Sequence, residues 1–200
     1  MKALIIVDMQ NDFIDGALGT KEAASIVSNV VKRIETSKDE LIIFTQDTHQ
    51  EDYLATPEGK KLPIPHCIQG TNGWQIHNDI KAAWLNKKGT PAIPGVPENT
   101  FIKSVFGSTD LVDFLKANTA TEPTDKPTSA SSPTSAHYNI TEIELLGVCT
   151  DICVISNAIM IKNALPHINI TVNANCCAGV TPQSHNEALN TMKMCHIDVL

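Results

Sequence analysis

Clusters of basic residues are missing from this 200-residue chain. It contains 15 Lys and Arg against 22 Asp and Glu, which gives a formal net charge of −7, and the basic residues are scattered rather than grouped. Binding to nucleic acid or to an anionic membrane surface depends on a concentrated positive field. The composition therefore excludes these partner classes and favours a small ligand that is neutral or bound to a metal.

Long apolar runs are also missing. No stretch approaches the roughly 20 residues that a membrane-spanning helix requires. The opening MKALIIVDMQ reaches Asp8 too early for the apolar part of a secretion signal. We therefore expect a cytoplasmic protein without a membrane partner. A disulfide framework is not expected in that compartment, so the six cysteines are predicted to be thiols.

The chain has no internal repeat, and hydrophobic residues make up 42% of it, which suffices for one domain over residues 1–200. Apolar runs predict six strands, at 2–8, 41–47, 99–104, 141–148, 169–179 and 196–200. Apolar residues at helical spacing predict helices at 21–38, 79–87, 108–117, 151–165 and 184–195. This alternation indicates an α/β fold with a doubly wound, six-stranded parallel sheet and helices on both faces.

Two segments interrupt this alternation. Residues 48–78 form a connection rich in Pro and Gly that is too long for an ordinary loop, so we expect it to carry function. Residues 117–139 are dominated by Thr, Ser, Pro and Ala and have almost nothing to bury. They are predicted to form a low-complexity, solvated insertion between a helix and the next strand.

Chemically active side chains gather at the predicted carboxyl ends of the strands, where ligands bind in sheets of this kind. Cys153 lies near the start of the helix predicted from Asp151, where unpaired N–H groups and the helix dipole stabilise a thiolate. Taken alone, it would be interpreted as a buried structural thiol. Asp8 and Lys103, at the ends of two other strands, add a base and a cation. Taken alone, Asp8 would be interpreted as an acidic residue of a turn, and Lys103 as a solvated lysine.

Cys149 lies four residues before Cys153 and raises the question of a metal knuckle or a redox pair. A zinc knuckle would need a second pair of cysteines or histidines, which the following residues lack. We predict instead that the backbone N–H groups of Cys149 and Cys153 form the oxyanion hole that acyl transfer requires.

A second cluster of polar side chains falls in and just before the long connection. Asp47 and His49 are separated by one residue at a strand end, so their side chains point the same way. With His66 and, less directly, Glu58, they predict a site for Zn²⁺, Fe²⁺ or Mn²⁺. The alternative is that these histidines are ordinary surface residues of a loop.

The segments IIVDMQNDF, QDTH, PHC, FIKS and GVCTDICV, in this order and spacing, resemble the isochorismatase-like cysteine hydrolases, particularly nicotinamidases. The resemblance covers nearly the whole chain except residues 117–139. It implies a catalytic triad of Asp8, Lys103 and Cys153 and a cis peptide bond between Val148 and Cys149. It also implies that a divalent metal ion, with zinc first among the three, anchors the pyridine nitrogen. The implied ligands are Asp47, His49, His66 and Glu58.

Amide hydrolysis is the activity that the resemblance implies, because family members that cleave a vinyl ether typically lack the nucleophilic cysteine. The predicted reaction converts nicotinamide to nicotinate and ammonia through a thioester. One alternative is a related hydrolase for another small amide, ureido or carbamoyl substrate. Another is a metal-binding or scaffolding protein without turnover, since fold does not fix function. Family members are often oligomers, so a homo-oligomer is a further expectation.

The pocket departs from the nicotinamidase pattern. Leu62, Pro63 and Ile64 stand where these enzymes usually carry an aromatic residue before the PPH-like segment, and only Phe106 follows the lysine. Phe106 and Phe13 are therefore the candidate pocket aromatics, although aromatic side chains such as Phe13 more often lie in the core. These departures bear on the substrate rather than on the chemistry.

Overall fold

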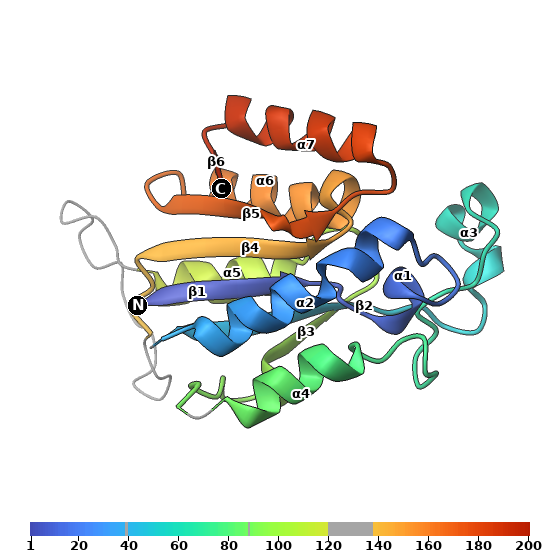
Figure 1. Ribbon diagram of the computed structural model, residues 1–200, viewed down its shortest axis with the longest axis horizontal. Helices are drawn as coiled ribbons and strands as arrows, with labels where there is room; N and C mark the ends of the chain where they lie inside the picture. Colours follow the sequence, from blue (N-terminus) through green and yellow to red (C-terminus); the bar gives the residue numbers. More distant parts are fainter. Residues whose placement is uncertain (39, 88, 120–137) are drawn as a thin grey trace.

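A parallel sheet forms the centre of the computed structural model, which describes residues 1–38, 40–87, 89–119 and 138–200 (Figure 1). Its six strands lie in the order β3-β2-β1-β4-β5-β6. The strands are β1 (Lys2–Val7), β2 (Leu41–Asp47), β3 (Thr100–Lys103), β4 (Glu142–Val148), β5 (Asn169–Ala178) and β6 (Asp198–Val199). The predicted fold class is confirmed, and each predicted strand is present with ends that differ by a few residues.

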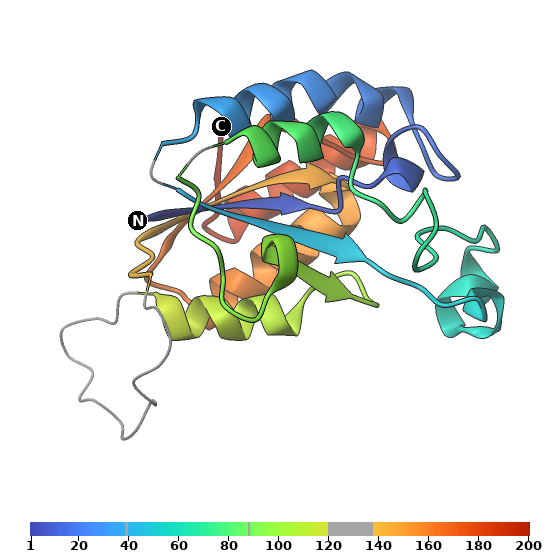
Figure 2. The ribbon, with the colours of Figure 1, turned by 90° about the horizontal axis from the view of Figure 1, so that it is seen from below.

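Helices cover both faces of the sheet, as Figure 2 shows. On one face α2 (Lys21–Thr36) packs against α4 (Asn78–Asn86), and on the other α5 (Thr109–Asn118) packs against α6 (Ile155–Ala164). The last helix, α7 (Pro182–Met194), contacts α6 and β6. Within the described ranges, no helix is both long enough and apolar enough to cross a membrane.

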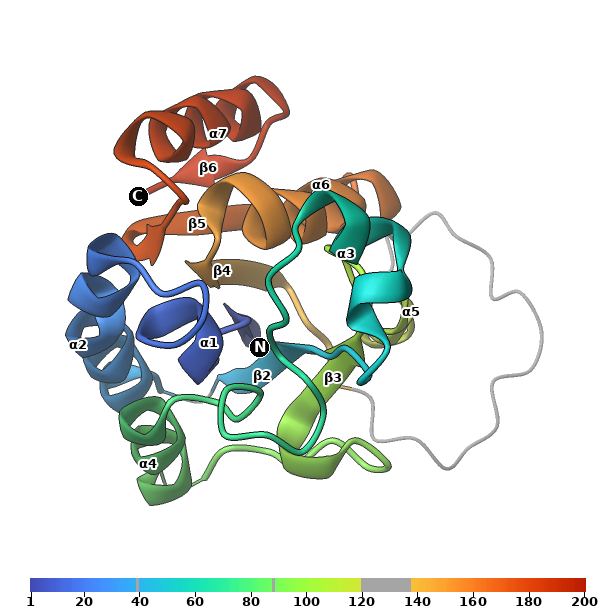
Figure 3. The same ribbon diagram turned by 90° about the vertical axis from the view of Figure 1, so that its right-hand side faces the viewer.

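Short elements that the sequence analysis missed lie beyond the carboxyl ends of the strands (Figure 3). They are α1 (Asn11–Ile14), the 3-10 turn η1 (Tyr53–Ala55) and α3 (Pro57–Lys61). A further 3-10 turn, η2 (Pro97–Asn99), immediately precedes β3. The predicted helix over 151–165 was wrong at its start, because a π-helical turn, η3 (Thr150–Val154), precedes α6. Residues 120–137 of the predicted insertion lie outside the described residues, and α5 includes its first two positions.

A buried carboxylate ties the central strand β4 to its neighbours at the amino end of the sheet. Glu144 is 2% exposed, and its oxygens accept hydrogen bonds from Arg33 on α2 at 2.9 Å and from Asn173 on β5 at 3.1 Å. Lys2 on β1 pairs with it at 2.5 Å. Burial alone would raise the pKa of the Glu144 carboxyl, but these three donors lower it to about 2. The carboxylate is therefore a pH-dependent source of stability.

Gly147 brings β4 against β1 just before the carboxyl edge of the sheet. It pairs with Val7, and its φ of 122° lies in a region that favours glycine. A Cβ atom at this position would lie 2.1 Å from the carbonyl oxygen of Val7. Only glycine therefore allows this approach, which sets the turn after β4 beside the residue that follows β1.

We expect Glu144→Gln to lower the free energy of unfolding at pH 7 by about 3 kcal/mol, because the charged partners lose their carboxylate. The folded pKa lies below the ordinary value of 4.5, so the contribution is full above that pH and disappears as the pH falls towards 2. Urea denaturation at pH 7 and pH 3 should show a smaller difference between variant and wild type at pH 3. Glu142→Gln, at an exposed position of the same strand, is the control. An equal loss at both pH values would contradict this assignment.

We expect Gly147→Ala to destabilise the protein by at least about 3 kcal/mol, because it adds a backbone clash to an unfavourable φ. Gly70→Ala is the matched control, since Gly70 also has a positive φ, of 84°, but nothing lies within 4 Å of an added Cβ. That variant should lose only about 1 kcal/mol. Equal midpoints of urea unfolding for the two variants would show that the approach to Val7 is unimportant.

Candidate active site

Asp8 stands at the carboxyl edge of the sheet, immediately after β1. It is fully buried and adopts a left-handed backbone conformation, with φ at 47°. The hydroxyl of Thr45 donates a hydrogen bond to its Oδ1 at 2.7 Å. Non-glycine residues are uncommon in this conformation, and such departures gather at functional sites.

Lys103 reaches the same point from the end of β3, two strands away. Its Nζ lies 2.6 Å from Asp8 Oδ2, 3.4 Å from Asp47 Oδ1 and 3.7 Å from Cys153 Sγ. Burial alone would lower the pKa of this lysine, but the three neighbours raise it. Lys103 therefore stays a cation although its side chain is only 2% exposed.

Cys153 lies in the π-helical turn η3, and it is 5% exposed. The peptide bond between Val148 and Cys149 is cis, as the family resemblance implies. Burial raises the pKa of the Cys153 thiol well above its ordinary value, and Asp8 adds to this effect, while Lys103 opposes it. These effects oppose a resting thiolate, so Cys153 calls for a base, and Asp8, which shares Lys103 as a neighbour with the thiol, is the candidate.

Asn157, which the sequence analysis missed, anchors this turn. Its side-chain amide donates to the carbonyl of Cys153 at 2.8 Å and to that of Phe106 at 3.2 Å, and its Oδ1 accepts from the N–H of Ser108 at 3.0 Å. The residue is completely buried. One side chain thus fixes the turn of Cys153 relative to the loop that follows Lys103.

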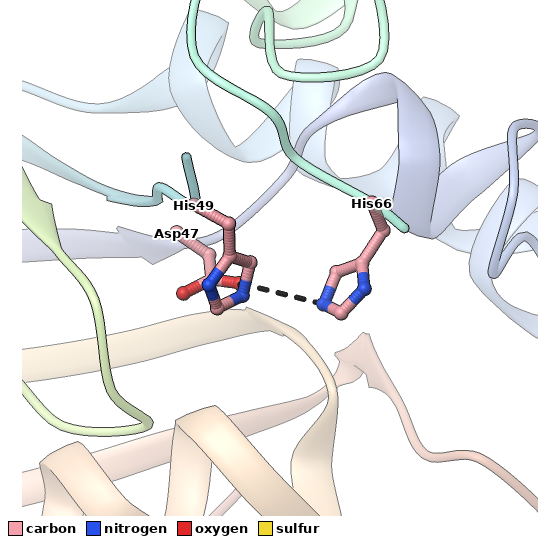
Figure 4. A group of neighbouring side chains, drawn as sticks. All are labelled: Asp47, His49 and His66. Carbon is pink, nitrogen blue, oxygen red and sulfur yellow. Dashed lines mark ion pairs between the residues drawn. The ribbon is translucent and has the colours of Figure 1, made fainter. Parts of the chain in front are cut away.

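Asp47, His49 and His66 form a buried cluster whose ligand atoms lie within 4.8 Å of one another (Figure 4). Asp47 Oδ2 is 3.0 Å from His49 Nε2 and 3.7 Å from His66 Nε2. Burial alone would raise the pKa of the Asp47 carboxyl, but His49, Lys103 and His66 lower it, so it stays an anion. Two imidazoles and a carboxylate suit a divalent metal ion.

The arrangement of the two histidines fits a metal. His66 Nδ1 lies 2.9 Å from the carbonyl oxygen of Ile64, which leaves its Nε2 free to ligate. Among the described residues, the buried Nε2 of His49 has no hydrogen-bond partner of good geometry. Glu58, on α3, lies at the edge of the cluster, with Oε1 3.8 Å from His49 Nε2 and 4.0 Å from His66 Nε2. The group whose ligand atoms converge is Asp47, His49 and His66, and Glu58 is its outer neighbour.

Two side chains from the segment after β1 bind the backbone next to the metal-ligand cluster. Neither role was predicted. Gln10 Nε2 donates to the carbonyl of Asp47 at 2.8 Å, and Gln10 Oε1 accepts from the N–H of Asp47 at 2.7 Å. Asp12 Oδ2 accepts from the N–H of Cys67, the neighbour of His66, at 2.7 Å. Both belong to the segment IIVDMQNDF, so the motif was visible although these roles were not.

One cavity of about 250 Å³ connects the two clusters. Cys153 and Cys149 line one part of it, and Asp47, His66 and Glu58 line another. Its apolar wall comes from Phe13, Leu18, Leu62, Phe106, Ile152 and Val180. Both candidate pocket aromatics line the cavity: Phe13 is 9% exposed and also packs in the core, whereas Phe106 is 50% exposed.

A family model, curated relatives and solved structures all match this chain to the same group of proteins. The Isochorismatase domain model matches residues 2–122. A nicotinamidase/pyrazinamidase of Mycobacterium tuberculosis is 25% identical, over 100% of this chain and 98% of that protein. The solved nicotinamidase PncA of Bacillus subtilis is 26% identical, with 99% of this chain and 98% of that chain covered and a TM-score of 0.73. A solved pyrazinamidase of Pyrococcus horikoshii, in complex with zinc, is also 26% identical, with 100% and 98% covered and a TM-score of 0.68. The chain belongs to the isochorismatase family.

Proposed function

We propose that this chain hydrolyses nicotinamide to nicotinate and ammonia through a thioester on Cys153. The enzyme class, a hydrolase of amide C–N bonds, follows from family membership and from the likeness to nicotinamidases. The observation that carries the finer proposal is the shared cavity. Cys153 and three of the candidate metal ligands, Asp47, His66 and Glu58, line one space of about 250 Å³, which can hold a small amide.

The reaction begins with proton transfer from Cys153 to Asp8. The thiolate stays beside Lys103, whose Nζ is 3.7 Å from the sulfur, and attacks the carbonyl carbon of the amide. The backbone N–H groups of Cys149 and Cys153 hold the oxyanion. When the C–N bond breaks, Asp8 returns its proton to the leaving ammonia, and water then hydrolyses the thioester to release the acid and the thiol.

Asp47, His49, His66 and Glu58 are proposed to hold a divalent metal ion. Zinc is favoured, because the Pyrococcus horikoshii relative was solved in complex with it and the donor set suits it. When bound, the metal supplies a Lewis-acidic anchor for the pyridine nitrogen. The chain's residues then orient the ring so that its carboxamide lies against Cys153.

A second candidate is hydrolysis of another small amide, ureido or carbamoyl compound. It is favoured by Leu62, an aliphatic side chain that lines the cavity where nicotinamidases usually carry an aromatic residue. Phe13 and Phe106 still give the cavity two aromatic rings. We therefore rank nicotinamide first.

Cys153→Ala should lower the kcat for ammonia release from nicotinamide by at least about 10³-fold, because the nucleophile is lost. The zinc content of the purified protein should not change, since the sulfur is not among the proposed ligands. Cys195→Ala, at a half-buried cysteine after α7, is the control and should behave as wild type. Turnover by the Cys153 variant close to the wild-type rate would rule out the mechanism.

A panel of amides separates the two candidate substrates. The zinc-loaded enzyme should turn over nicotinamide with saturation, and benzamide, which lacks the ring nitrogen, with a KM raised about tenfold or more, since one metal–ligand bond is lost. Removing the metal with a chelator should bring the two KM values together. Silence towards nicotinamide, together with saturable turnover of a ureido or carbamoyl compound, would favour the second candidate.

A further inference from the structure

Tyr53 packs directly against both histidines of the candidate metal site. It belongs to η1, is 1% exposed and is one of the largest fully buried side chains of the protein. Its ring centroid lies 4.7 Å from that of His49 and 5.0 Å from that of His66, and the two imidazole centroids are 4.8 Å apart. The three rings therefore form one packed cluster behind the ligand atoms.

The two histidines differ in what else fixes their rings. His66 is oriented by the contact of its Nδ1 with the carbonyl of Ile64, at 2.9 Å, and by the ring of Phe13, 5.5 Å away. The Nε2 of His49 lies 3.0 Å from Asp47 Oδ2, and the ring of Tyr53 is the nearest aromatic neighbour of the His49 ring. The orientation of the His49 ring is thus restrained by the packing of Tyr53 together with the contact to Asp47.

The hydroxyl of Tyr53 makes a second connection. It donates to the carbonyl of Leu62 at 2.9 Å, and Leu62 lines the cavity immediately after α3. The backbone carbonyl of Tyr53 accepts from the hydroxyl of Thr56, the N-cap of α3, at 2.7 Å. A Cβ atom on Gly59 would lie 2.1 Å from that carbonyl oxygen, so α3 and Tyr53 are in close contact. Glu58, the outer candidate ligand, lies on the same short helix.

We propose that Tyr53 is a positioning residue that orients His49 for the metal through its ring and holds the Leu62 wall of the substrate cavity through its hydroxyl. This inference rests on the proposed metal site and substrate cavity. The ring and the hydroxyl act on different parts of the site, so two substitutions separate their effects.

Tyr53→Leu removes the ring, and Tyr53→Phe removes only the hydroxyl. We expect Tyr53→Leu to weaken zinc binding about 10- to 100-fold, the usual effect of losing a residue that orients a metal ligand. Tyr53→Phe should keep zinc affinity within about twofold of wild type, because its ring still packs on His49. It should instead raise the KM for nicotinamide several-fold with little change in kcat, because the Leu62 wall is loosened. Zinc affinity is measured on metal-stripped protein by competition with a chromophoric chelator, and circular dichroism confirms that each variant is folded.

Tyr138 provides a matched control, since its hydroxyl also donates to a backbone carbonyl, that of Ala92 at 2.6 Å, and its ring packs against Phe114 at 5.8 Å. Tyr138→Leu and Tyr138→Phe should reduce stability without changing zinc affinity or KM. Wild-type zinc affinity in Tyr53→Leu, or an equal loss of affinity in Tyr53→Phe, would overturn the proposed role of the ring. An unchanged KM in Tyr53→Phe would overturn that of the hydroxyl. A wild-type protein that binds zinc but does not hydrolyse nicotinamide would refute the proposed substrate while leaving the role of the ring to be decided by the zinc titration.

Discussion

The buried ion pair between Lys103 and Asp8 is the constraint on which the rest of the site depends. Its two charged atoms are 2.6 Å apart, and the side chains are 2% and 0% exposed. Charges removed from water are costly unless they are paired, and losing one partner of such a pair typically costs about 3–5 kcal/mol. Asp8 follows β1 and Lys103 ends β3, and because β2 lies between these parallel strands, the pair spans the end of β2 at one edge of the sheet. The sheet order and the site are therefore parts of one arrangement.

Asp47 extends this arrangement into the metal site. Register pairs it with Lys103 across β2 and β3, and its two oxygens face different partners. Oδ1 lies 3.4 Å from Lys103 Nζ, whereas Oδ2 lies 3.0 Å from His49 Nε2. One carboxylate thus joins the cluster around Cys153 to the candidate metal ligands. Gln10, which holds both backbone groups of Asp47, fixes the carboxylate at this junction.

The sequence predicted the parts of this site that depend on strand ends. Asp8, Asp47 and Lys103 each stand at the end of an apolar run, and parallel strands bring such ends to one edge. Other roles could not be read from local pattern. Gln10 and Asn157 act on residues 37 and up to 51 positions away, and Tyr53 acts by packing rather than by a motif. α1 and α3, with four and five residues, are too short for a helical period to be recognised.

Burial also determines how charge is distributed before and after the proposed proton transfer. It raises the pKa of both the Asp8 carboxyl and the Cys153 thiol, so neither group is ionised as readily as it would be in water. When the proton moves from sulfur to carboxylate, the negative charge moves from one neighbour of Lys103 to another, from 2.6 Å to 3.7 Å away. The buried lysine has an anionic partner before and after the step. A thiolate can therefore form in an apolar cavity without leaving an unpaired charge. Its formation requires neither a helix terminus nor a lowered pKa of the resting thiol.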